Sequence, residues 1–180
     1  MSRYILAPPP NDSSRFKESY LYCWAAGLAS FLNVTKLGGV SYSDIVGATG
    51  AYMNADGSIP ETGGTPVDNQ GVAIPGAISG GIGAVFSLYN VYSTLINCST
   101  FSYQYVLNIL QTKGHMIIMY GVGGGMGHTQ VVYGVGVPDD NNISLFDPMT
   151  SATDYQNIPI TTVSGSGSNM YVAWAAWAGP

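Results

Sequence analysis

The sequence has little charge, and very little of it is positive. Among 180 residues, five Lys and Arg stand against ten Asp and Glu, which gives a net charge of −5. The basic residues are scattered along the chain, at Arg3, Arg15, Lys17, Lys36 and Lys113. Nucleic acid is therefore not an expected partner, because no continuous positive stripe is available to follow phosphates. Disorder is not expected either, since 46% of the residues are hydrophobic.

Cysteine is also scarce, and this limits disulfide and metal chemistry. Cys23 and Cys98 could form at most one bridge. No CxxC or HxxxH spacing is present, so neither a zinc site nor any other metal or cofactor is expected.

The start of the sequence lacks the basic, apolar and cleavage-site segments of a signal peptide. We therefore expect synthesis in the reducing cytoplasm without a classical leader.

Charge is missing altogether between Asp68 and Lys113. A membrane span needs about 20 predominantly apolar residues, but residues 71–89 carry five Gly, one Pro and two Ser. We expect no membrane span here. A hairpin or a helix that packs against the rest of the domain fits this composition better.

The order of the predicted elements favours an α+β fold. Apolar spacing and capping residues predict helices over 23–33, from Ser41 or Ser43, and over 102–111. Strands are predicted over 116–120, 129–135, 143–146 and 170–174. Helices come first and strands second, as in α+β domains, and the length of 180 residues predicts a single domain over 1–180. Its helical lobe would span about 1–112 and its antiparallel sheet lobe about 113–180.

Three residues together indicate nucleophilic catalysis. Cys23 stands at the start of the first predicted helix, His128 at the head of a strand, and Asp147 at the end of the next one. A helix N-terminus and a neighbouring imidazolium both favour the thiolate, which is the nucleophile. An Asp can hold the other imidazole nitrogen. Taken singly, each residue also fits a structural role: a core thiol, a structural His and an Asp-Pro turn.

Other candidate residues give weaker indications of a functional site. The glycine-rich run over 121–127 is followed by a His and β-branched residues, whereas a phosphate-binding loop needs a helix there, so a turn between strands is expected. His115 is interpreted as structural. Cys98 is interpreted as a free thiol, since no His or Asp lies near it in sequence.

The order of three short strings resembles that of papain-like cysteine peptidases. The strings are YLYCWAA at 20–26, GHTQVVYGV at 127–135 and ISLFDP at 143–148. They are most similar to the bacterial branch that includes bacteriocin-processing peptidases and secreted plant-pathogen effector proteases. The resemblance covers residues 20–150. It implies a papain-like fold with the active site between the two lobes, and it leaves export as an effector open.

The resemblance implies a cysteine peptidase that cleaves peptide bonds in a protein or peptide substrate through a thioester acyl-enzyme. Cys23 would be the nucleophile, His128 the general base and acid, and Asp147 the orienting carboxylate. The same triad could instead serve deamidation or acyl transfer on a protein substrate. A non-catalytic papain-like binding module is a further alternative. The sequence leaves the oligomeric state and the substrate undetermined.

The sequence departs from this family at the oxyanion donor. Papain-like enzymes usually carry Gln six residues before the nucleophile, where this chain has Lys17. Lys17 and Gln130 are therefore the oxyanion candidates, with Ser19 as another, and Lys17 could equally be a solvated side chain. Gln130 qualifies because it lies two residues beyond His128 on a predicted strand and so shares its face.

Overall fold

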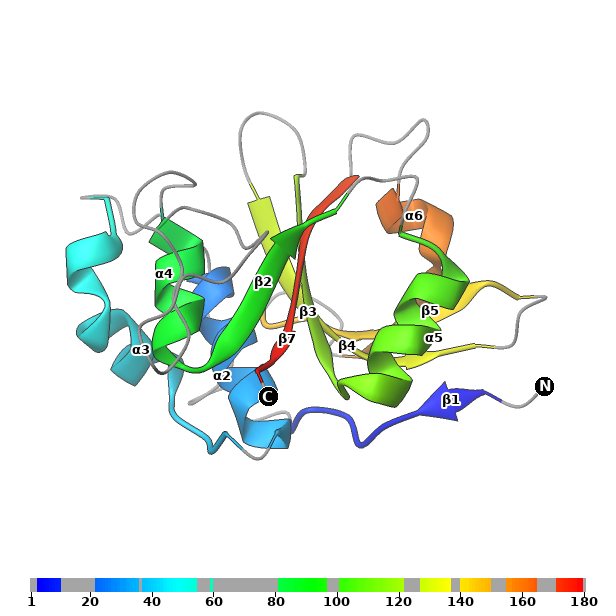
Figure 1. The fold of residues 1–180 in the computed structure, drawn as a ribbon, viewed down its shortest axis with the longest axis horizontal. Helices are drawn as coiled ribbons and strands as arrows, with labels where there is room; N and C mark the ends of the chain where they lie inside the picture. The colour runs from blue at the N-terminus through cyan, green and yellow to red at the C-terminus, as the bar shows by residue number, and fades with distance from the viewer. Residues whose placement is uncertain are drawn as a thin grey trace.

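The protein forms an antiparallel sheet with helices on both faces (Figure 1). The computed structural model describes residues 3–10, 22–35, 37–54, 59, 81–96, 101–121, 127–136, 140–149, 155–164 and 171–179. Six strands of the seven-stranded sheet follow the order β2-β7-β3-β4-β5-β6, and β1 pairs with β4. The strands are β1 (Tyr4–Ile5), β2 (Val91–Leu95), β3 (Met116–Gly121), β4 (Gly127–Val135), β5 (Asn142–Phe146), β6 (Tyr155–Pro159) and β7 (Tyr171–Ala178).

The helices divide between the two faces of the sheet. They are α2 (Cys23–Val34), α3 (Tyr42–Ala48), α4 (Gly81–Leu88), α5 (Tyr103–Thr112) and α6 (Ile160–Ser164), with a short 3-10 helix η1 (Gly50–Tyr52). One core cluster joins α2, α3 and α4 to Ile117 and Met119 of β3. A second joins α5 and α6 to Met116 and Ile118. Because successive strand residues point to opposite faces, β3 contributes to both layers of the core.

The helix starts agree with the sequence signals. Ser41 caps α3 through a capping box with Asp44, and Ser102 caps α5 by accepting a hydrogen bond from the Tyr105 backbone N–H. Such side chains satisfy N–H groups that the helix itself leaves unpaired. The helix predicted over 23–33 and the strands predicted from 116 onward are likewise present, as α2, β3, β4, β5 and β7.

Three strands lie outside these predictions: β1, β2 and β6. β2 precedes residue 112, and so does β1, so the sheet takes strands from both sides of the predicted lobe boundary. β6 has alternating exposed and half-buried residues and ends in Pro159, as suits a strand paired on one edge only.

Within residues 71–89, α4 is a helix whose Val85 and Phe86 are fully buried. Over the described ranges, no helix has the length and apolar character that crossing a membrane requires.

Candidate active site

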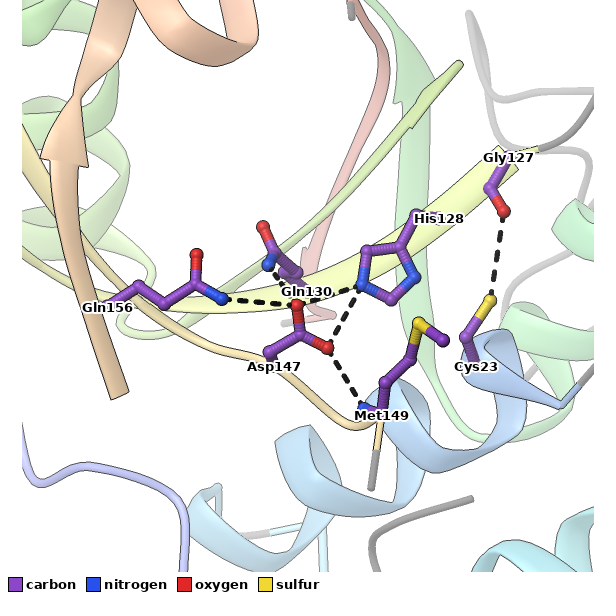
Figure 2. A network of polar contacts seen from close by, with 7 residues as sticks. All are labelled: Cys23, Gly127, His128, Gln130, Asp147, Met149 and Gln156. Atoms are coloured by element: carbon purple, nitrogen blue, oxygen red, sulfur yellow. Dashed lines mark hydrogen bonds and ion pairs between the residues drawn. The ribbon is translucent and has the colours of Figure 1, made fainter. Parts of the chain in front are cut away.

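The first contact at the site joins two neighbouring strands. His128 is the second residue of β4, and Asp147 directly follows the last residue of β5. These strands pair antiparallel, with Val131 opposite Phe146, so the start of β4 meets the end of β5. The Nε2 atom of His128 lies 3.0 Å from Oδ1 and 3.1 Å from Oδ2 of Asp147 (Figure 2). The carboxylate therefore holds Nε2, which donates the hydrogen bond.

Cys23 approaches the same imidazole from the helical layer. It is the first residue of α2 and is buried, with 9% of its surface exposed. Its thiol donates to the backbone carbonyl of Gly127 at 3.9 Å, one residue before His128. Figure 2 shows the second ring nitrogen of His128 on the side of Cys23, opposite the Asp147 contact. The ring of His128 thus lies between a thiol and a carboxylate.

The electrostatics of the pair favour a charged imidazole. Burial alone lowers the pKa of His128, but hydrogen bonds to Asp147 and Cys23 and the charge of Asp147 outweigh burial and raise the pKa to about 9. Burial also raises the pKa of Asp147, yet the hydrogen bond and charge of His128 prevail and hold it below its usual value. At neutral pH the two groups therefore form an imidazolium–carboxylate ion pair.

Three further donors hold the Asp147 carboxylate (Figure 2). The Met149 backbone N–H donates to Oδ1 at 2.9 Å. Side-chain amides of Gln130 and Gln156 donate to Oδ2 at 2.6 Å and 3.3 Å. With 4% of its surface exposed, Asp147 has exchanged water for these partners.

The structure brings together four of the sequence candidates: Cys23, His128, Asp147 and Gln130. Gln130, a candidate oxyanion donor, directs its amide nitrogen at Asp147. Lys17, Ser19 and Cys98 lie outside the described residues. His115 is elsewhere: its Nε2 donates to the Ala7 carbonyl at 2.7 Å, and burial lowers its pKa.

Two residues of the site have no signal in the sequence. Gln156 reaches Asp147 because β6 pairs with β5, where Leu145 lies opposite Gln156. Met149 follows the Asp-Pro turn and extends its side chain toward His128 and Cys23 (Figure 2). Neither contact depends on a spacing in the sequence. Among the described residues, no group of three or more His, Cys, Asp or Glu could hold a metal ion.

Comparisons with known proteins give little further information. No family model and no curated protein matches the chain. One similar solved structure comes from work on the structural basis for the limited antibody cross reactivity between the mite allergens Blo t 1 and Der p 1. Its identity to this chain is 11% and its TM-score 0.49, over 100% of this chain and 71% of that one. At this level of similarity the chain is assigned to no family.

Proposed function

We propose that the protein is a papain-like cysteine peptidase in which Cys23, His128 and Asp147 form the catalytic triad. The observation that carries the proposal is the position of the His128 ring, with Nε2 on Asp147 and its other nitrogen on the side of Cys23. A carboxylate on Nε2 leaves Nδ1 as the nitrogen that exchanges a proton with the thiol. Cys23 at the first position of α2 adds the positive end of a helix dipole.

The proposed reaction starts from the His128 imidazolium, whose Nδ1 has taken the proton of the Cys23 thiol. The thiolate then attacks the carbonyl carbon of the scissile peptide bond, and a tetrahedral intermediate forms. His128 gives the proton to the departing amine as the C–N bond breaks, which leaves a thioester on Cys23. His128 then takes a proton from water, and the resulting hydroxide attacks the thioester, which releases the acid and restores the Cys23 thiolate beside the His128 imidazolium. Asp147 keeps the imidazole oriented throughout.

The negative oxygen of the tetrahedral intermediates needs hydrogen-bond donors. Within the described part of the chain, no side chain caps α2, so the backbone N–H groups of its first turn are free to serve. Cys23 would supply one of these donors. Lys17 stays the predicted side-chain donor, because the Gln130 amide nitrogen is bound to Asp147. If Lys17 acts so, Lys17→Ala should lower kcat by roughly 100-fold, with Lys17→Gln recovering much of it.

The decisive experiment compares wild-type protein with Cys23→Ala on a denatured cellular proteome. Labelling of new N-termini, followed by mass spectrometry, should show cleavages with the wild type only. Cys98→Ala is the matched control and should cleave like the wild type. Substrate masses that rise by about one dalton without new termini would indicate deamidation instead, and cross-linked or acylated products would indicate transfer. Identical termini with wild type and Cys23→Ala would exclude the proposed peptidase.

A binding module with an inactive triad makes a different prediction. Peptide-resolved mass spectrometry after treatment with iodoacetamide at pH 6 measures the thiolate of each cysteine separately. An active triad should make Cys23 react much faster than Cys98, because only Cys23 combines a helix start with an imidazolium. Equal rates at the two cysteines would favour the binding module.

A further inference from the structure

Gln130 is a buried amide directed at the proposed catalytic carboxylate. Its Nε2 lies 2.6 Å from Oδ2 of Asp147, and 2% of the residue is exposed. His128 and Gln130 are two residues apart on β4, so their side chains project from the same face of the strand. At this end of the strand pair, the last paired residues are Val131 of β4 and Phe146 of β5. Gln130 and Asp147 are the next residues beyond this pair. The same segment of β4 thus supplies both the imidazole and an amide to one carboxylate.

Among the described residues, Asp147 alone sets the orientation of the Gln130 amide. Rotation by half a turn would put the oxygen Oε1 against the carboxylate, where two acceptors would repel each other. In the observed orientation Oε1 is buried and has no hydrogen-bond partner among the described residues. An unpaired buried oxygen lowers stability, whereas an apolar side chain of the same shape would avoid this loss. Packing therefore does not account for Gln at this position.

The contact also suits the chemistry of the carboxylate. An amide carries no proton that titrates, so it donates to Asp147 equally well when His128 is charged and when it is neutral. The Met149 N–H fixes Oδ1 at 2.9 Å, and Gln130 fixes Oδ2. Contacts on two oxygens hold the plane of the carboxylate, and of the two amides on Oδ2 Gln130 lies nearer than Gln156. The nearly equal distances from His128 Nε2 to both oxygens, 3.0 Å and 3.1 Å, depend on this plane.

We propose that Gln130 is a positioning residue, which fixes the plane of the ionised Asp147 carboxylate so that both of its oxygens face Nε2 of His128. In this orientation Oε1 of Gln130 is left without a hydrogen bond among the described residues. The inference rests on the proposed triad and assigns Gln130 a role within it. Gln156 donates to the same oxygen from β6 at the longer distance of 3.3 Å and assists to a smaller degree.

The test replaces Gln130 with Met, which has a similar shape and no amide. Two readouts apply: the rate of Cys23 alkylation by iodoacetamide at pH 6, and the pKa of His128 by NMR of the ring, with His115 as internal reference. In Gln130→Met the alkylation rate should fall by about tenfold, as when the outer partner of an oriented histidine is lost. The pKa of His128 should move down, and Tm should fall as well, because the buried Asp147 carboxylate loses its shortest donor. A merely structural glutamine would lower Tm but leave both the alkylation rate and the pKa of His128 unchanged.

Two variants calibrate the result. Gln156→Met should reduce the alkylation rate less than Gln130→Met, in line with its longer contact. Gln104→Met, on the exposed side of α5, should match the wild type in both readouts. If Gln130→Met does not fold, Gln130→Asn serves in its place, because its amide is one methylene too short to reach Asp147 and the same losses are expected.

The failure of this inference differs from the failure of the triad. Wild-type reactivity and an unshifted His128 in Gln130→Met, or in Gln130→Asn, would overturn the role of Gln130 while the triad stands. A wild-type Cys23 that reacts no faster than Cys98, or no faster than in His128→Ala, would overturn the triad itself.

Discussion

Gly27 of α2 faces the methyl group of Thr129 in β4 so closely that a Cβ atom added to Gly27 would lie 2.6 Å from Thr129 Cγ2. This contact adjoins the site on both elements. Gly27 lies about one helical turn after Cys23, and Thr129 directly follows His128. The absence of a side chain at Gly27 therefore sets how near α2 comes to β4, and with it how near the thiol comes to the imidazole.

Gly27→Ala should separate these two elements. Because Thr129 is buried, its methyl group has little room to move, and we expect α2 to shift or strain. Overpacking of this kind costs about 1–3 kcal/mol of stability, measurable from the midpoint of urea unfolding. The alkylation rate of Cys23 at pH 6 should fall in the same variant.

Two controls separate this close approach from the general effect of a helical glycine. The double variant Gly27→Ala/Thr129→Ser removes Cγ2 and should recover most of the stability and reactivity. Gly47→Ala in α3 adds a Cβ that meets nothing within 4 Å, and it should leave stability unchanged or raise it by up to about 1 kcal/mol. A Gly27→Ala protein with wild-type stability and reactivity would show that the approach of α2 to β4 is not tight.

Local signals in the sequence account for the parts of the fold that depend on neighbouring residues. Ser41 and Ser102 cap helices because a short polar side chain before an apolar period satisfies the first N–H groups. The order of Cys23, His128 and Asp147 could be interpreted because each stands at the end of an element. One partner of Asp147 could not be predicted in this way. Gln156 contacts it only through the pairing of β5 with β6, and a half-polar edge strand has no hydrophobic pattern to reveal it.

The two histidines should respond oppositely to removal. His128→Ala deletes the partner of both Cys23 and Asp147, so rapid alkylation of Cys23 at pH 6 and turnover should both be lost. His115→Ala removes only the hydrogen bond to the Ala7 carbonyl, and it should retain nearly full reactivity. Its stability should fall by about 1 kcal/mol, the usual net contribution of one hydrogen bond, because Ala7 is exposed and its carbonyl can bind water instead. The reverse outcome would show that His115, and not His128, is the base.

Substitution of Asp147 should give graded losses. Every described partner of this carboxylate is a donor, so Asp147→Asn keeps one acceptor oxygen but turns its NH2 group toward Gln130 or His128. Asp147→Ala removes both acceptors and leaves the imidazole unoriented, with an expected loss in kcat of about 1000-fold or more. Asp147→Asn should retain more activity than Asp147→Ala and less than the wild type. If both variants turned over like the wild type, Asp147 would not belong to the site.

The pKa shifts of the pair predict how stability depends on pH. Although burial opposes it, the hydrogen bonds to Asp147 and Cys23 raise the pKa of His128 from 6.5 to about 9, so the folded state binds this proton more tightly than the unfolded state. The stability that His128 contributes is fully present below about pH 6.5 and is lost as the pH rises toward about 9. The pKa of Asp147 is lowered from 3.8, so its contribution is present above that value and is lost as the pH falls through the lowered pKa.

Urea unfolding of wild type and His128→Gln at several pH values between 6 and 9.5 isolates the effect of His128, because His115 titrates in both proteins. The difference in unfolding free energy between them should shrink steadily over this range, and a constant difference would mean that His128 is not protonated in the folded protein at neutral pH.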